Sequence, residues 1–119
     1  MLTKELFRVV FGNGSYMSLK SQVCTDSKPF YWVYESDLPY ESCVDSAGED
    51  LQFIIGYLER SVGFDSDRVS KFKSSDVEVI AIYNDIIRGQ KDFLSKVRLV
   101  AAAAKAEESQ PQHTTCQGS

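Results

Sequence analysis

The sequence predicts an α+β domain in which an N-terminal three-stranded antiparallel sheet (meander) is packed by a middle helix and a long C-terminal helix. Strand-forming segments separated by turn signals occupy the first third of the chain, and apolar residues recur at helical spacing through most of the rest. The 119 residues are 43% hydrophobic and 25% charged, an ordinary globular composition. A meander this small cannot bury its apolar face alone, so we expect the helices to cover it.

The first two strands are predicted on either side of a glycine-rich turn. Residues 6–11 are rich in β-branched and aromatic side chains, and the turn residues Gly12 to Ser15 follow them. Residues 16–23 alternate between polar and apolar side chains, which predicts a half-buried strand. Its inward residues are expected to be Met17, Leu19 and Val23.

The third strand has the strongest signal in the chain. After a second turn at residues 25–29, residues 30–34 are all aromatic or β-branched. Alternation along a strand sends neighbouring side chains to opposite faces. We expect Phe30, Trp32 and Tyr34 on one face, with Tyr31 and Val33 on the other.

The middle helix is predicted from about Ala47 to Val62. Ser46 and Glu49 have the spacing of a capping box, which satisfies free amides at a helix start. Apolar residues then recur at helical intervals, at Leu51, Ile54, Ile55, Leu58 and Val62. Gly63 is expected to terminate this helix, and residues 65–72 to add a short helical turn.

A second capping-box spacing, at Ser75 and Glu78, begins the predicted C-terminal helix. Its apolar face comprises Ile80, Tyr83, Ile87, Leu94, Val97, Ala101 and Ala104. We expect a long helix with a break at Gly89. The alternative makes residues 77–83 a fourth strand, because β-branched residues dominate this segment and alternate within it.

Residues 1–106 are predicted to form a single α+β domain, and residues 107–119 a disordered tail of polar and small residues. The three cysteines include no C-x-x-C pair and are odd in number, which favours a reducing compartment. Whether Cys24 and Cys43 approach each other stays open. Charged residues interrupt the N-terminus, and no apolar run approaches 18 residues, so we expect a cytoplasmic protein with no membrane contact.

The residue inventory argues against an enzyme. The single histidine, His113, falls in the predicted tail, so the usual triads and zinc sites cannot be assembled with it. We therefore expect no catalytic residues, no cofactor and no metal. The formal charge of −4, and the acids interspersed among the basic residues of the late helix, argue against direct nucleic-acid binding. An enzyme using carboxylates or tyrosines would require a concave pocket with displaced pKa values.

Charge is polarised along the chain. Residues 29–59 contain seven acidic side chains and no Lys or Arg, whereas residues 60–105 contain nine basic and six acidic ones. The acidic segment also carries tyrosines, which serve as interface anchors. The candidate partner-binding residues are Tyr34, Glu35, Asp37, Tyr40, Glu41 and Asp45. In the structural alternative, Phe30 and Trp32 are core residues and the acids only solubilise a loop.

These patterns indicate a small acidic, non-enzymatic binding protein that inhibits or modulates a partner protein by occupying its surface. An inhibitor, an immunity-type protein or a phage-encoded modulator fits this size and acidity, and we expect the partner's surface to be basic. The alternative is a structural or adaptor subunit that self-associates, as a homodimer for instance, through its C-terminal helix. This helix has a second apolar set, Val79, Ile82, Ile86, Phe93, Val97 and Val100.

Overall fold

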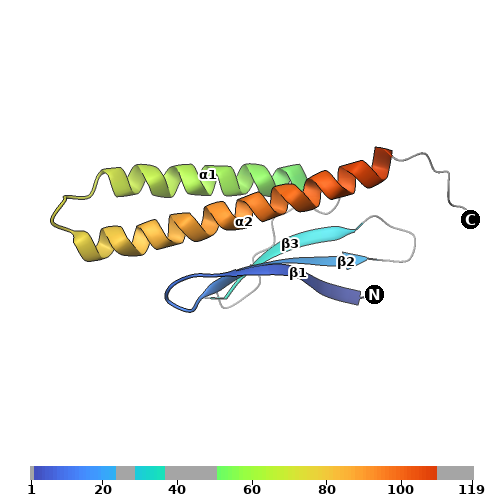
Figure 1. Cartoon of the computed structure of the whole chain (residues 1–119), viewed down its shortest axis with the longest axis horizontal. Helices are drawn as coiled ribbons and strands as arrows, with labels where there is room; N and C mark the ends of the chain where they lie inside the picture. Colours follow the sequence, from blue (N-terminus) through green and yellow to red (C-terminus); the bar gives the residue numbers. More distant parts are fainter. Residues whose placement is uncertain (1, 24–28, 37–50, 110–119) are drawn as a thin grey trace, which may run out of the picture.

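The structure, a computed structural model, describes residues 2–23, 29–36 and 51–109 and confirms the predicted α+β fold. An antiparallel sheet in the order β1-β2-β3 is followed by two helices that lie side by side over one of its faces (Figure 1). The elements are β1 (Leu2–Val10), β2 (Tyr16–Val23), β3 (Phe30–Glu35), α1 (Leu51–Ser70) and α2 (Val77–Ser109).

A β-bulge in β1 adjusts how this strand meets the helices. Glu5 pairs with Lys20 and Phe7 pairs with Leu19, so Leu6 is an extra residue with no partner on β2. A bulge of this kind re-aims the neighbouring side chains. As a result, both Leu6 and Phe7 pack against the hydrophobic core.

The core lies between the inner face of the sheet and the two helices. The buried residues of β2 and β3 on this face include Met17, Leu19, Tyr31 and Val33, as the alternation predicts for the two β2 residues. The helices contribute Leu51, Ile54, Ile55, Leu58, Phe93, Leu94 and Val97. The third predicted inward residue, Val23, has a side chain outside the described part of the structure.

The aromatic residues of β3 divide between the two faces as predicted. The register places Phe30, Trp32 and Tyr34 opposite the outward residues of β2. Phe30 is 40% exposed, whereas Trp32 on the same face is only 8% exposed. It is therefore Tyr31 and Val33, not Phe30 and Trp32, that join the core under the helices.

The predicted end of the middle helix at Gly63 is wrong. α1 continues through this glycine to Ser70 and includes most of the separate turn expected at residues 65–72. Glycine lowers helix stability by only about 1 kcal/mol relative to alanine. Contacts of the later turns with α2, such as that between Asp65 and Gln90, hold the helix beyond Gly63. The predicted start at residues 47–50 lies outside the described residues.

The expected break of the C-terminal helix at Gly89 is also wrong, because α2 is continuous from Val77 to Ser109. Gly89 serves the packing instead. A Cβ atom at this position would lie 1.9 Å from Cε1 of Phe11, so the Phe11 ring occupies the space of the missing side chain. This close approach anchors the end of β1 on α2.

The ends of α2 are also shifted from their predicted places. The helix, rather than a fourth strand, occupies residues 77–83, and Asp76 precedes it. The Asp76 carbonyl accepts a hydrogen bond from the Ile80 amide at 3.0 Å, so the cap lies at Asp76 instead of Ser75. At the other end, residues 107–109 of the predicted tail are helical, and residues 110–119 lie outside the described residues.

Neither described helix combines the length and the apolarity that crossing a bilayer requires.

Substituting the two glycines separately tests the packing at Gly89. Gly89→Ala should destabilise the protein by about 1–3 kcal/mol, because the new methyl group overlaps the Phe11 ring. Gly63→Ala should instead stabilise it by about 0.5–1 kcal/mol, because a Cβ there meets no atom within 4 Å. Chemical denaturation of the two variants measures both changes. Stabilisation by both substitutions would contradict the Phe11 contact.

Candidate functional site

The sheet covers only part of the helical hairpin. At its end, the Gly12 amide donates a hydrogen bond to Oδ2 of Asp85 at 2.7 Å. α2 begins at Val77, about two helical turns before this contact. Residues 64–84, here called the overhang, therefore extend beyond the sheet, and Figure 1 shows this end of the hairpin projecting past β1 and β2.

The overhang exposes large apolar side chains. Phe64, Val77, Val79 and Ile82 are between 42% and 66% exposed. Val79 lies 18 residues before Val97, and Ile82 lies 11 residues before Phe93, so helical periodicity puts them on the stripe that packs on the sheet. Phe93 and Val97 are fully buried. Val79 and Ile82 are exposed because the sheet ends before it reaches them.

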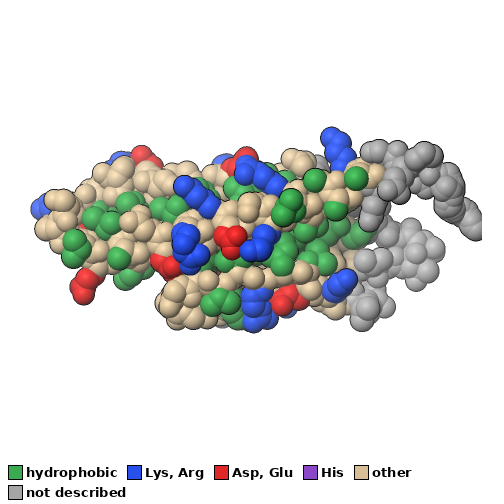
Figure 2. All heavy atoms as spheres, viewed as in Figure 1, with side chains coloured by type: hydrophobic (Ala, Val, Ile, Leu, Met, Phe, Trp, Pro, Cys, Tyr) green, Lys and Arg blue, Asp and Glu red, His purple; other side chains and the backbone are tan. Residues whose placement is uncertain are grey.

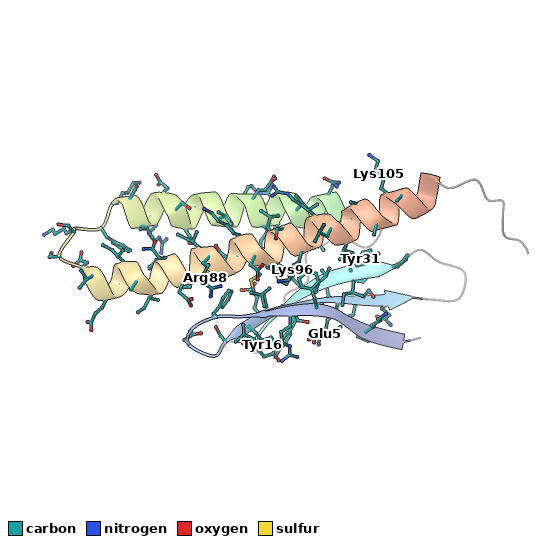
Figure 3. The ribbon with its side chains drawn as sticks, in the orientation of Figure 1. Glu5, Tyr16, Tyr31, Arg88, Lys96 and Lys105 are labelled. Carbon is teal, nitrogen blue, oxygen red and sulfur yellow. The ribbon has the colours of Figure 1, made fainter. Side chains whose placement is uncertain are left out.

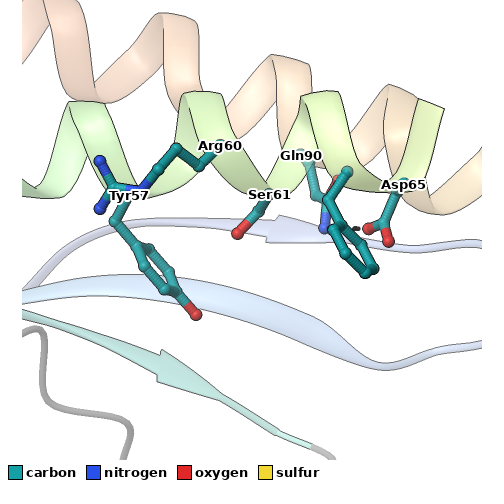
Figure 4. A pocket seen from close by; sticks show the side chains of 6 residues that line it. Tyr57, Arg60, Ser61, Asp65 and Gln90 are labelled. Carbon is teal, nitrogen blue, oxygen red and sulfur yellow. Dashed lines mark hydrogen bonds between the residues drawn. The ribbon is translucent and has the colours of Figure 1, made fainter. Parts of the chain in front are cut away.

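A pocket lies beside the overhang, where α1 passes the end of the sheet. Its volume is about 320 Å³, and it is lined by Tyr57, Arg60, Ser61, Phe64, Asp65 and Gln90. Figure 4 shows the side chains of Tyr57, Ser61 and Asp65 on the side of α1 that faces the sheet. Phe64 belongs to both the pocket and the overhang, so the two features form one continuous surface.

Two polar side chains connect α1 and α2 at the pocket wall. Nε2 of Gln90 donates a hydrogen bond to Oδ2 of Asp65 at 3.0 Å. Oε1 of Gln90 is buried and has no hydrogen-bond partner among the described residues. An acceptor left in this state costs about 1–3 kcal/mol of folding free energy.

Tyr57 is a pocket residue whose pKa is shifted by its surroundings. Partial burial of the phenol is the main reason that its pKa is raised, and the negative charge of Glu35 raises the pKa further. A hydrogen bond with Ser61 acts in the opposite direction. The phenol therefore stays protonated, and available as a hydrogen-bond donor, to higher pH than an exposed tyrosine.

Two arginines lie at the pocket, and Arg60 is one of its lining residues. The pKa of Arg68 is raised first by its hydrogen bond with Tyr83 and also by the charge of Asp65. Nη1 of Arg68 donates a hydrogen bond to the Tyr83 hydroxyl at 3.3 Å, and its guanidinium lies 5.0 Å from the ring centroid of Phe64. Nη1 of Arg60 lies 3.4 Å from the Cβ position of Gly56, one turn earlier on α1. Within the described part of the chain, neither arginine forms a salt bridge with Asp65.

Of the candidate partner-binding residues, only Tyr34 and Glu35 are described. They point to opposite faces of the sheet, because Glu35 pairs with Met17 on the core side and Tyr34 pairs with Ser18 on the outer side. The other four, Asp37, Tyr40, Glu41 and Asp45, lie outside the described residues. The described structure therefore does not bring Tyr34 and Glu35 together, and it does not test the other four residues of the predicted cluster.

Tyr34 belongs to a network on the outer face of the sheet. Its ring centroid lies 5.8 Å from that of Tyr16, and Nζ of Lys20 lies 4.7 Å above it. Next to Tyr16, Arg8 forms a salt bridge with Glu5 at 2.8 Å, and the pKa of Glu5 is lowered chiefly by this contact. Figure 3 shows Tyr16 and Glu5 on the side of the sheet away from the helices. These contacts keep the outer-face charges paired.

Most basic residues of α2 have acidic partners. Arg88 pairs with Asp85, Lys96 with Asp92, and Arg98 with Glu59. Figure 2 shows Lys and Arg side chains interspersed with Asp and Glu on this face, with apolar side chains between them. In the ranges that the structure describes, no group of three His, Cys, Asp or Glu side chains could hold a metal ion.

The pocket residues were not predicted from the sequence. Tyr57, Ser61 and Asp65 follow one another at intervals of four, so they share one face of a helix, and this signal could have been found. Gln90 could not have been found in this way. Its place beside Asp65 depends on how α1 and α2 pack against each other.

The titration of Tyr57 tests the electrostatics of the pocket. Glu35→Gln should lower its pKa, because it removes a nearby negative charge, whereas Ser61→Ala should raise it. Because folding raises the pKa of Tyr57, this group contributes stability at pH values below its unfolded-state pKa of about 10. The contribution is lost as the pH rises through the folded-state pKa. NMR titration of the Tyr57 ring measures both shifts. Shifts of the same sign in the two variants would contradict the arrangement.

Comparison with protein-family models, curated proteins and solved structures finds no match to this chain.

Proposed function

We propose that this protein is a non-enzymatic binding protein that inhibits or modulates a partner protein by occupying its surface. The observation that carries the proposal is the apolar stripe of the overhang, where Val79 and Ile82 continue the core-facing side of α2 into solvent. Exposed apolar groups clustered at one end of a molecule and surrounded by polar residues are typical of interaction sites. Binding would remove these side chains from water, as the sheet does for Phe93 and Val97.

The charge distribution supports a basic partner. Residues 37–50 contain five acidic side chains and no Lys or Arg. Concentrated negative charge speeds the encounter with a basic surface and disfavours acidic partners. Tyr34, Glu35, Asp37, Tyr40, Glu41 and Asp45 remain the proposed contacts in this segment, and the function is proposed for the cytoplasm.

Self-association through α2 is the second candidate. The same exposed stripe favours it, because two copies could bury Val79 and Ile82 against each other. The protein would then be a structural or adaptor subunit. The two candidates differ in whether the isolated chain is a monomer.

A matched pair of substitutions on α2 tests the role of the overhang. Ile82 is 58% exposed on the apolar stripe, whereas Leu99 is 70% exposed away from it. Ile82→Asp should reduce recovery of the partner from the native lysate at least about tenfold, equivalent to about 1.4 kcal/mol, because it places a charge in the interface. Leu99→Asp should leave recovery unchanged. Quantitative capture with mass spectrometry measures the difference.

Light scattering of the same purified variants separates the two candidates. The modulator function is supported if the wild-type protein is a monomer that captures one partner, and if Ile82→Asp loses this capture while Leu99→Asp keeps it. A wild-type dimer that only Ile82→Asp dissociates supports self-association. Equal behaviour of Ile82→Asp and Leu99→Asp in both measurements contradicts the use of the overhang.

A second pair of variants tests the acidic segment. Glu41→Lys combined with Asp45→Lys should weaken partner binding at low salt by more than about tenfold, and the loss should shrink as salt screens the charges. Glu107→Lys combined with Glu108→Lys makes the same change in net charge at the end of α2 and should have little effect. Equal weakening by both pairs would indicate that only net charge matters.

A further inference from the structure

The pocket beside the overhang contains two acceptors that no described residue satisfies. Oε1 of Gln90 is buried and accepts no hydrogen bond from the residues that the structure describes. Oδ2 of Asp65 accepts the bond from Gln90 Nε2, and within the described structure no hydrogen bond reaches the second carboxylate oxygen. One hydrogen bond joins the two side chains, so both unsatisfied acceptors belong to the same linked pair. A ligand for this site should therefore supply several donors in a fixed arrangement.

A guanidinium group meets this requirement better than an ammonium group. It is planar, always charged, and presents N–H donors as a rigid fork that can bond to a carboxylate and a neighbouring oxygen together. Its flat faces also stack on aromatic rings. The pocket provides such rings, because Tyr57 and Phe64 are among its lining residues.

Arg60 lines the pocket and the charge of Asp65 acts on Arg68, but in the described structure neither arginine is hydrogen-bonded or salt-bridged to this carboxylate. Arg68 is held by the Tyr83 hydroxyl and the Phe64 ring, and Arg60 lies beside Gly56. Phe64 is the 62% exposed wall of the pocket, so a change of its rotamer would open a path for a donor to the buried Oε1 of Gln90 without disturbing the core. Neither native guanidinium needs to be displaced from Asp65.

We propose that the pocket formed by Tyr57, Phe64, Asp65 and Gln90 receives an arginine side chain from the partner protein. The guanidinium donates to Asp65 and to Oε1 of Gln90 and stacks against an aromatic wall. This inference rests on the protein-binding function proposed above and specifies one contact of it. The pocket adjoins the overhang through Phe64, so apolar contacts and the arginine would belong to one interface.

NMR titration with single amino-acid ligands tests the pocket without the partner. Nα-acetyl-argininamide should cause saturable shifts of the Gln90 side-chain amide and of the Asp65 backbone amide. Nα-acetyl-citrullinamide has nearly the same shape without the charge, and it should bind at least about tenfold more weakly. No saturable shift, or equal affinity for citrulline, overturns the proposal. Equal affinity for Nα-acetyl-lysinamide overturns the choice of arginine.

Two substitutions on α1 localise the binding. Asp65→Asn keeps an acceptor for Gln90 Nε2 but removes the charge, so it should weaken arginine binding at least about tenfold. Asp67→Asn removes the same charge two residues away, where the carboxylate pairs with exposed Lys71 at 3.1 Å, and it should change the affinity little. Equal affinities in the two variants overturn the assignment to Asp65.

Capture of the partner distinguishes failure of the pocket from failure of the proposed function. If Ile82→Asp abolishes capture but argininamide does not bind, the pocket proposal fails and the binding function stands. If argininamide binds at Asp65 while Ile82→Asp leaves capture unchanged, the proposed use of the overhang fails and the arginine site stands. Loss of capture in Asp65→Asn, with retention in Asp67→Asn, supports both.

Discussion

The packing of a short sheet against a longer helical hairpin is the constraint on which the rest of this structure depends. α2 has 33 residues and spans about 50 Å, whereas β1 has nine residues and spans about 30 Å. The sheet can therefore cover only part of the apolar face that runs along the hairpin. Where it does, Phe93 and Val97 are fully buried, and where it does not, Val79 and Ile82 are exposed. The candidate interface is a direct result of this difference in length.

The point along α2 at which the sheet stops covering the helices is set by contacts between the β1–β2 turn and α2. The Phe11 ring lies against Gly89, and the Gly12 amide donates to Asp85. Both contacts need a particular residue in α2, since any side chain at position 89 would overlap the ring and only an acceptor at position 85 can bond to the amide. They fix the sheet under the later turns of α2, and the earlier turns project as the overhang. The pocket forms at the same boundary, because Tyr57 and Ser61 lie near the end of the sheet while Phe64 lies in the overhang.

The charges of the protein separate into two groups with different consequences. In the described structure, most of the charged side chains that lie on α2 and on the outer face of the sheet are paired, as with Arg88 and Asp85 or Arg8 and Glu5. Exposed pairs of this kind contribute little to stability, but they leave no large basic patch. By contrast, residues 37–50 carry acids without any basic residue, and Asp65 has no salt bridge within the described ranges. Both the acid-rich segment of the sequence and Asp65 thus supply the negative charge on which the proposed binding of a basic partner relies.

The order and type of the elements could be predicted from the sequence, because alternation of apolar residues at Met17 and Leu19 and helical spacing from Leu51 to Val97 are local patterns. Alternation also divided the β3 residues between two faces, but it did not show that Tyr31 and Val33, rather than Phe30 and Trp32, face the helices. Local patterns could not decide the roles of Gly63 and Gly89, because both glycines lie inside continuous helices and only Gly89 makes a close contact, with Phe11. Nor could they place Gln90 beside Asp65 or show where the sheet stops, because both depend on how elements far apart in the chain pack together. How far the sheet extends along α2 settles which part of its apolar stripe stays exposed, and the packing of α1 on α2 settles which polar groups meet in the pocket.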